Sequence, residues 1–267
     1  MGHRGRVVLH TVPAHVHHPG HFGAGRRVIL MVAKPITELP SSFQESMWVD
    51  GDPEPSPLVL DFRPILELMA RLEYSEREID RWMIEFNHAN HELVGKLELD
   101  ADGALLITPM QRQKGSWEEL ETGRLLGNWA EEYGGEAHGA RLGIRLPNGQ
   151  RYAPDAAWIS PEQLANRPEP YPAPEDWLLP FCPAFVVEIR SRSDRLAPLQ
   201  RKLADYIANG ALLGWLIDPH QRRVHIYRTG VDPEVLDDPE TVNGETVLPG
   251  FVFEVRQRIF DREDVSR

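Results

Sequence analysis

The fold is decided by residues 184–191, which read AFVVEIRS, an apolar run of strand composition with one carboxylate, Glu188, at its centre. About thirty residues upstream, residues 152–159 read YAPDAAWI and carry a second isolated carboxylate, Asp155. Both runs are rich in β-branched and aromatic residues and are bounded by Pro or Ser. We therefore expect two neighbouring strands of one sheet, each holding a single buried acid.

Two buried carboxylates need a chemical reason. Removing an unpaired carboxylate from water is costly, and two close carboxylates raise each other's pKa unless a divalent cation lies between them. Mg²⁺ takes one or two carboxylates together with water and substrate phosphates. The pattern indicates a phosphodiester-cleaving metal site at Asp155 and Glu188. In the structural alternative, Asp155 ends its strand in solvent and Glu188 forms an ion pair with a nearby Arg.

The chain after Glu188 predicts a helix and two more strands. In residues 199–210 the apolar side chains recur at i, i+4, i+7 and i+8, which is one helix face, and an Asn-Gly pair supplies the C-cap. Residues 213–218 and 223–228 have strand composition. Lys202 lies beside the apolar face of the predicted helix, so its amine can reach towards the strand of Glu188.

These residues together resemble the PD-(D/E)XK nuclease superfamily and, within it, the bacterial Uma-type branch of restriction-endonuclease-like proteins. The matching positions are Pro154-Asp155, Val187-Glu188, Ser191, Ser193-Asp194, Lys202, Tyr206, Gly214-Trp215 and Asp218-Pro219. The resemblance extends to residues 91–97, 145–149 and 248–251, and so covers about residues 74–260. Each short motif is weak alone, but their order and spacing are specific.

The resemblance implies an α/β (α+β) fold: a restriction-endonuclease-like core with a mixed central sheet flanked by helices. It also implies Mg²⁺ or Mn²⁺ held by Asp155 and Glu188, and a catalytic Lys. The superfamily pattern places that Lys two residues after the Glu, where this chain has Arg190. Many members of this branch carry the Lys on the following helix instead, so the resemblance implies Lys202 as the catalytic cation. Arg190 does not deprotonate and so cannot act as a base, and we expect it to be an auxiliary phosphate contact.

An acid on the first core helix is a further candidate. Residues 116–129 have helical periodicity, and Glu119 is the best match to the helix acid that many nucleases of this superfamily add to the site. Ser116 with Glu119 three residues later also reads as a capping box. The catalytic and capping interpretations of Glu119 both stay open.

The implied function is a divalent-metal-dependent endonuclease that hydrolyses DNA. The alternative is a catalytically inactive binding or regulatory module of the same fold, which Arg190 and the net charge of −12 favour, since DNA-binding domains usually carry a basic surface. Basic residues cluster locally at 190–202 and 222–223, so a basic rim on an acidic protein is compatible with DNA binding. The expected partner is DNA, with a homodimer as an open alternative to a monomer.

Composition limits the class and the compartment. Hydrophobic content of 41% and charged content of 26% are ordinary for a globular protein. No apolar run approaches the roughly 18 residues of a membrane span, and the first residues lack the apolar core of a signal peptide. Cys182 is the only cysteine, which excludes an internal disulfide and favours the cytoplasm. We expect a buried structural thiol at this position.

The N-terminal part of the chain differs from the rest. We expect residues 1–57 to be a poorly structured His-, Pro- and Gly-rich extension, of which 1–30 could be a mis-assigned upstream segment, and residues 58–267 to form the restriction-endonuclease-like domain. Residues 58–72 predict a short strand or helix. A capping-box pattern at Ser75 starts a helix that runs to about Asn90.

Overall fold

The computed structural model describes residues 58–89, 95–108, 113–167, 178–192 and 194–262. The predicted extension over residues 1–57 lies outside the described residues, as does the centre of the Pro-rich segment between the two acidic strands. None of the helices in the described ranges is long and apolar enough to cross a membrane.

The first of two larger sheets has five strands in the order β1-β3-β2-β6-β5, all paired antiparallel. Its strands are β1 (Leu58–Asp61), β2 (Lys96–Leu99), β3 (Ala104–Thr108), β5 (Ile144–Arg145) and β6 (Arg151–Tyr152). Two helices accompany this sheet, α2 (Arg63–Arg71) and α3 (Glu76–Ala89). Leu97 and Leu99 of β2 pack with apolar residues of both helices.

The second sheet has six strands in the order β11-β10-β9-β8-β7-β4. Its strands are β4 (Glu136–Gly139), β7 (Ala156–Ile159), β8 (Phe185–Ile189), β9 (Leu213–Asp218), β10 (Arg223–Arg228) and β11 (Glu234–Asp237). The β8–β9 pair is parallel and the other pairs are antiparallel. The predicted mixed sheet is therefore confirmed.

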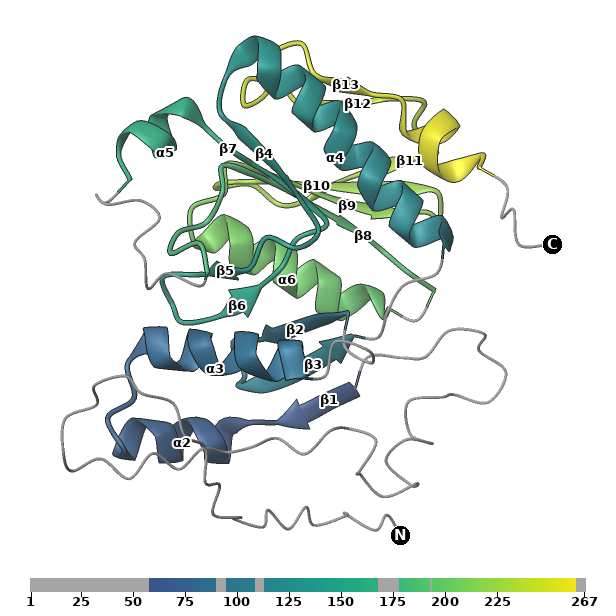
Figure 1. Ribbon diagram of the computed structural model, residues 1–267. Helices are drawn as coiled ribbons and strands as arrows, with labels where there is room; N and C mark the ends of the chain where they lie inside the picture. Colours follow the sequence, from purple (N-terminus) through teal and green to yellow (C-terminus); the bar gives the residue numbers. More distant parts are fainter. Residues whose placement is uncertain (1–57, 90–94, 109–112, 168–177, 193, 263–267) are drawn as a thin grey trace, which may run out of the picture.

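Helices cover both faces of the six-stranded sheet (Figure 1). The helices of this half are α4 (Gln113–Tyr133), α5 (Pro161–Ala165) and α6 (Leu196–Ala208). The last described elements are a two-stranded ribbon, β12 (Val242–Asn243) with β13 (Val252–Phe253), and a short π-helix, Arg256–Phe260. Side chains alternate across β8, so Val187 packs in the core on the α4 side and Val186 in the core on the α6 side.

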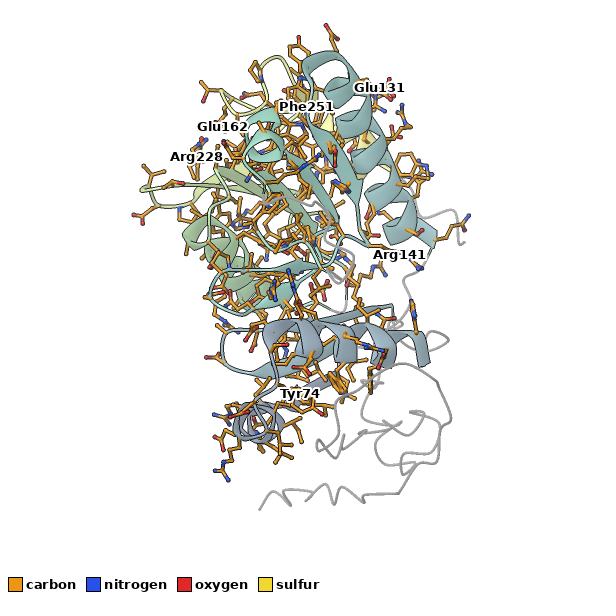
Figure 2. The ribbon with its side chains drawn as sticks, turned by 60° about the vertical axis from the view of Figure 1, so that its left-hand side comes forward. Tyr74, Glu131, Arg141, Glu162, Arg228 and Phe251 are labelled. Atoms are coloured by element: carbon orange, nitrogen blue, oxygen red, sulfur yellow. The ribbon has the colours of Figure 1, made fainter. Side chains whose placement is uncertain are left out.

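The two sheets lie one above the other, and α6 lies below the six-stranded sheet at the level of β5 and β6 (Figure 1). Figure 2 shows Tyr74 at the end of the molecule that carries α2, and Glu131 and Phe251 towards the opposite end. The candidate site residues come from both sheets and from α4 and α6, so this stacked arrangement brings them together.

The run at residues 152–159 is not one strand, as the sequence predicts, but two. β6 ends at Tyr152 in the first sheet and β7 begins at Ala156 in the second. Pro154 lies in the break, where it has no N–H to donate to a strand neighbour. Asp155 therefore follows the crossing between sheets and immediately precedes β7.

Of the two capping boxes predicted at helix starts, the structure contradicts one and contains the other. α4 begins at Gln113, so Ser116 lies inside the helix and the predicted capping box with Glu119 is wrong. At α3 the box is present: Glu78 N donates to Ser75 Oγ at 3.3 Å, and Ser75 N donates to Glu78 Oε2 at 2.7 Å. Residues 58–72 form a strand followed by a helix, β1 and α2, rather than one or the other.

Candidate active site

Asp155 lies directly against Glu188. The Asp155 backbone N donates to Val187 O at 2.9 Å, and the Asp155 carboxylate accepts from Ile189 N through Oδ2 at 2.7 Å. Asp155 thus contacts the residues on both sides of Glu188 in the neighbouring strand. Both acids are buried, each with 3% exposure, so neither ends its strand in solvent.

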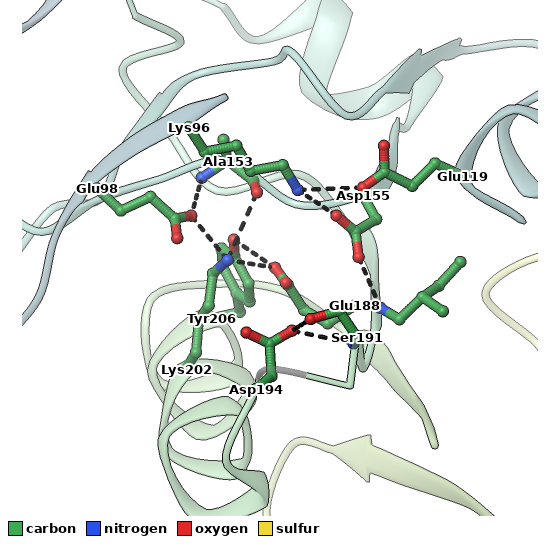
Figure 3. A network of polar contacts seen from close by, with 11 residues as sticks. Lys96, Glu98, Glu119, Ala153, Asp155, Glu188, Ser191, Asp194, Lys202 and Tyr206 are labelled. Atoms are coloured by element: carbon green, nitrogen blue, oxygen red, sulfur yellow. Dashed lines mark hydrogen bonds and ion pairs between the residues drawn. The ribbon is translucent and has the colours of Figure 1, made fainter. Parts of the chain in front are cut away.

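The two carboxylates share one face of the six-stranded sheet. Ala157 and Ile159 of β7 and Val186 of β8 pack in the core beneath α6. Because side chains two residues apart in a strand point the same way, Asp155 and Glu188 belong to this same face. Figure 3 shows both carboxylates directed into one polar network.

Lys202 supplies a buried cation from α6. Its Nζ lies 2.8 Å from Glu188 Oε1 and 2.7 Å from Glu98 Oε1, and donates to Ala153 O at 3.4 Å. The hydroxyl of Tyr206, one helical turn further on, donates to Glu188 Oε1 at 3.1 Å. The cation predicted from sequence therefore reaches the strand of Glu188, and its position is set from both sheets (Figure 3).

A second lysine reaches the other half of the site. Lys96 of β2 forms an ion pair with Asp155 Oδ1, and its Nζ lies 3.5 Å from Glu119 Oε1 of α4. Glu119 is therefore part of the polar network, although not as a helix cap. The Lys96, Asp155 and Glu119 side chains are 16%, 4% and 14% exposed, so this contact is largely shielded from water.

The ionisation of the two acids differs because their neighbours differ. Burial raises the pKa of Glu188 to about 8, a rise that repulsion from Asp155 supports and that Lys202 opposes. Burial also acts to raise the pKa of Asp155, but the ion pair with Lys96 outweighs it, so this pKa lies below its usual value. The carboxylates around Lys202 more than compensate for its burial, and its pKa is raised.

Arg190 is directed elsewhere. Its Nη1 donates to Asp218 Oδ2 at 2.7 Å, and its Nε donates to Asp194 O at 3.0 Å. Asp218 is fully buried, so Arg190 balances a carboxylate on β9. Asp194 accepts from Ser191 N at 3.0 Å and from Ser191 Oγ at 2.7 Å, which closes the turn after β8.

Lys96 and Glu98 are the two site residues that the sequence interpretation did not assign. They alternate with Leu97 and Leu99 in β2, whose apolar side chains pack with α2 and α3. Lys96 and Glu98 therefore share the opposite face of β2, which is turned to the six-stranded sheet. The KLEL alternation was the available signal, but it does not say which partners lie across from the polar face.

The site is a compact set of opposite charges on oxygen and nitrogen atoms. Counting only the residues that the structure describes, four carboxylates contact the two lysines: Glu98, Glu119, Asp155 and Glu188. With all six groups ionised the set carries −4 + 2 = −2. In the described ranges, no group of three or more His, Cys, Asp or Glu side chains is arranged to hold a metal ion. Two carboxylates completed by water and substrate oxygens are the arrangement that Mg²⁺ accepts.

Comparisons with known proteins agree with this architecture. The fold is similar to that of a protein from Anabaena variabilis ATCC 29413, described as a putative nuclease belonging to DUF820, with a TM-score of 0.53 and 19% sequence identity. The similarity covers 61% of this chain and 89% of that one. No match was found among curated proteins. A family model described as "Putative restriction endonuclease" matches residues 85–256, which is most of the chain and includes every residue of the site, so the protein belongs to the Uma2 family.

Proposed function

We propose that this protein is a divalent-metal-dependent endonuclease that hydrolyses phosphodiester bonds of DNA. The observation that carries the proposal is the convergence of Asp155 and Glu188 on one sheet face, with the Lys202 amine 2.8 Å from Glu188. Membership of the family described as "Putative restriction endonuclease" supports nuclease chemistry. We place this activity in the cytoplasm, and a homodimer stays a prediction for a sedimentation measurement.

The residues present fit a hard divalent cation. Asp155 and Glu188 would hold Mg²⁺ or Mn²⁺, because carboxylate oxygens are the ligands these ions prefer. With all six groups ionised, the four carboxylates and the two lysines in contact with them carry a net charge of −2, which one divalent ion neutralises. When bound, such an ion polarises the scissile phosphate and lowers the pKa of a bound water.

The protein's own groups have separable roles in this proposal. Lys202 would stabilise negative charge that develops on the phosphoryl oxygens, and Glu98 and Tyr206 would hold Lys202 and Glu188 in place. Glu119 would support the Asp155 half through Lys96. Arg190 uses Nη1 and Nε for internal contacts, so an auxiliary phosphate contact would fall to Nη2.

An inactive binding or regulatory module is the second candidate. The observation that favours it is the ion pairing of both predicted metal ligands with lysines. The expected basic surface is also reduced, because Arg222 pairs with Asp238 and Asp261, and Arg223 pairs with Asp237. This candidate predicts DNA binding or partner binding without metal-dependent cleavage.

Plasmid nicking with Mg²⁺ or Mn²⁺, paired with calorimetric titration of the metal, separates the two candidates. Wild type should nick DNA, and Asp155→Asn and Glu188→Gln should lose both cleavage and metal binding. Lys202→Ala should lower turnover at saturating DNA by about a hundredfold with metal binding retained. Arg190→Lys should instead raise the DNA concentration needed, with an effect that fades in salt.

The matched control is Glu162→Gln, which removes an exposed carboxylate from α5 and should change neither measurement. Cleavage that survives Glu188→Gln unchanged would contradict the proposal and point to a contaminating nuclease. A wild type that binds DNA but neither binds metal nor cleaves would favour the inactive module.

A further inference from the structure

The position of Lys96 has a consequence for how many ions the site can hold. Lys96 reaches Asp155 and Glu119 from the five-stranded sheet, whereas Lys202 reaches Glu188 and Glu98 from α6. The network therefore has two halves, each with one ammonium group between two carboxylates. The halves meet where Asp155 lies against Glu188.

Within the described ranges, Lys96 has no other ion pair to explain its burial. Among the described residues, its acidic partners are Asp155 and Glu119, and its side chain is only 16% exposed. Taking an ammonium group out of water is costly unless it is well paired. The pairing places its charge on a predicted metal ligand, Asp155, and on the helix acid that the family resemblance implies, Glu119.

We infer that Lys96 is a built-in cation that replaces a second divalent ion at the Asp155–Glu119 half, so that each chain holds one Mg²⁺ or Mn²⁺ ion. This inference rests on the proposed function and deepens it. It assigns Lys96 as a positioning residue that holds Asp155 and sets the metal stoichiometry.

Charge balance supports one ion rather than two. With all six groups ionised, the four carboxylates and two lysines sum to −2, and one divalent cation brings the set to zero. A second ion would bring it to +2 among groups shielded from water, where uncompensated charge is expensive. Without the positive charge of Lys96, the same set would carry a net charge of −3, and two bound divalent ions would bring it to +1.

The test counts Mn²⁺ ions per chain in the full-length protein, by isothermal titration calorimetry and by the loss of the free Mn²⁺ paramagnetic resonance signal. Wild type should bind one ion. Lys96→Met, which keeps the length of the side chain and removes the charge, should double the stoichiometry to two. The double variant Lys96→Met with Glu119→Gln should return it to one, because the second ion would lose a carboxylate ligand.

Lys114→Met is the matched control, since Lys114 is a partly buried lysine of α4 that pairs with Glu118, and it should bind one ion as wild type does. Two ions in wild type would overturn the inference without any variant. One ion in a Lys96→Met protein whose circular dichroism matches wild type would overturn it as well.

Failure of the inference is distinguishable from failure of the proposed function. Asp155→Asn and Glu188→Gln in an otherwise wild-type chain should abolish the single ion. If they do, and Lys96→Met stays at one ion, only the role of Lys96 is refuted. If wild type binds no ion, or if both variants keep it, the metal site itself is refuted and the inference falls with it.

Discussion

Replacement of Glu188 with Gln should remove a loss of stability that the metal-free protein shows as pH rises. Glu188 is buried beside Asp155, and its pKa is raised to about 8 from the usual 4.5. The folded state therefore holds the Glu188 proton at pH values where the unfolded chain has released it. The contribution of Glu188 to the free energy of unfolding of wild type is fully present below about pH 4.5 and is lost as pH rises through about 8. Gln has the shape of the protonated acid and cannot ionise.

The size of the effect follows from the shift. A difference of one pKa unit corresponds to about 1.4 kcal/mol, so the rise from 4.5 to about 8 sets an upper limit of about 5 kcal/mol. Repulsion between the Asp155 and Glu188 carboxylates links their titrations, so the loss should be spread over a wide pH range. We expect the free energy of unfolding of wild type to fall relative to Glu188→Gln by a few kcal/mol between pH 5 and pH 9.

Urea denaturation in EDTA, repeated at pH 5, 7 and 9, measures this difference, and Glu162→Gln serves as the exposed-acid control. The two curves should lie close together at pH 5 and separate as pH rises. Parallel pH profiles for wild type and Glu188→Gln would refute the reasoning. A variant that is less stable at every pH would mean that Glu188 is held as an ionised structural partner of Lys202.

Three further predictions follow from other contacts. Glu98→Gln removes one of the two carboxylates that hold Lys202, so turnover should fall roughly tenfold to a hundredfold while Mn²⁺ affinity stays unchanged; equal losses in both would indicate general damage to the site. Arg190→Ala leaves the buried Asp218 carboxylate unpaired and should lower the free energy of unfolding by about 3–5 kcal/mol in denaturant titrations, a loss that adding Asp218→Asn should partly reverse. Gly135 has φ of 85°, and an added Cβ would clash with the backbone of β7, so Gly135→Ala should lower the thermal midpoint through about 1–3 kcal/mol of strain; an unchanged midpoint would contradict this.

Sequence patterns alone were sufficient for two strands of the central sheet and for the end of the helix α6. β9 and β10 have the predicted limits, Leu213–Asp218 and Arg223–Arg228. α6 ends as predicted at the Asn-Gly pair, where Gly210 has φ of 112°. The helix starts three residues before the predicted start. Pro198 is tolerated there because it lies in the first turn, where its missing N–H is not needed. These features depend on residues close together in the chain, so local composition and periodicity carry them.

Tertiary structure decided where strands end and which charges meet. Nothing in the YAPDAAWI run says that Tyr152 and Ala156 belong to different sheets, since both halves have strand composition. Ser116 has the spacing of a helix cap, yet the helix extends beyond it and leaves Glu119 to contact Lys96.

The site itself divides in the same way. Asp155, Glu188 and Lys202 were identifiable from sequence because isolated polar residues in apolar segments and a resemblance in motif order mark them. Lys96 and Glu98 join them from 55 or more residues away, through the stacking of one sheet on the other. An ion pair in a buried site depends on which groups face each other across that interface. Spacing along the chain sets only the side of a strand or helix on which each group lies.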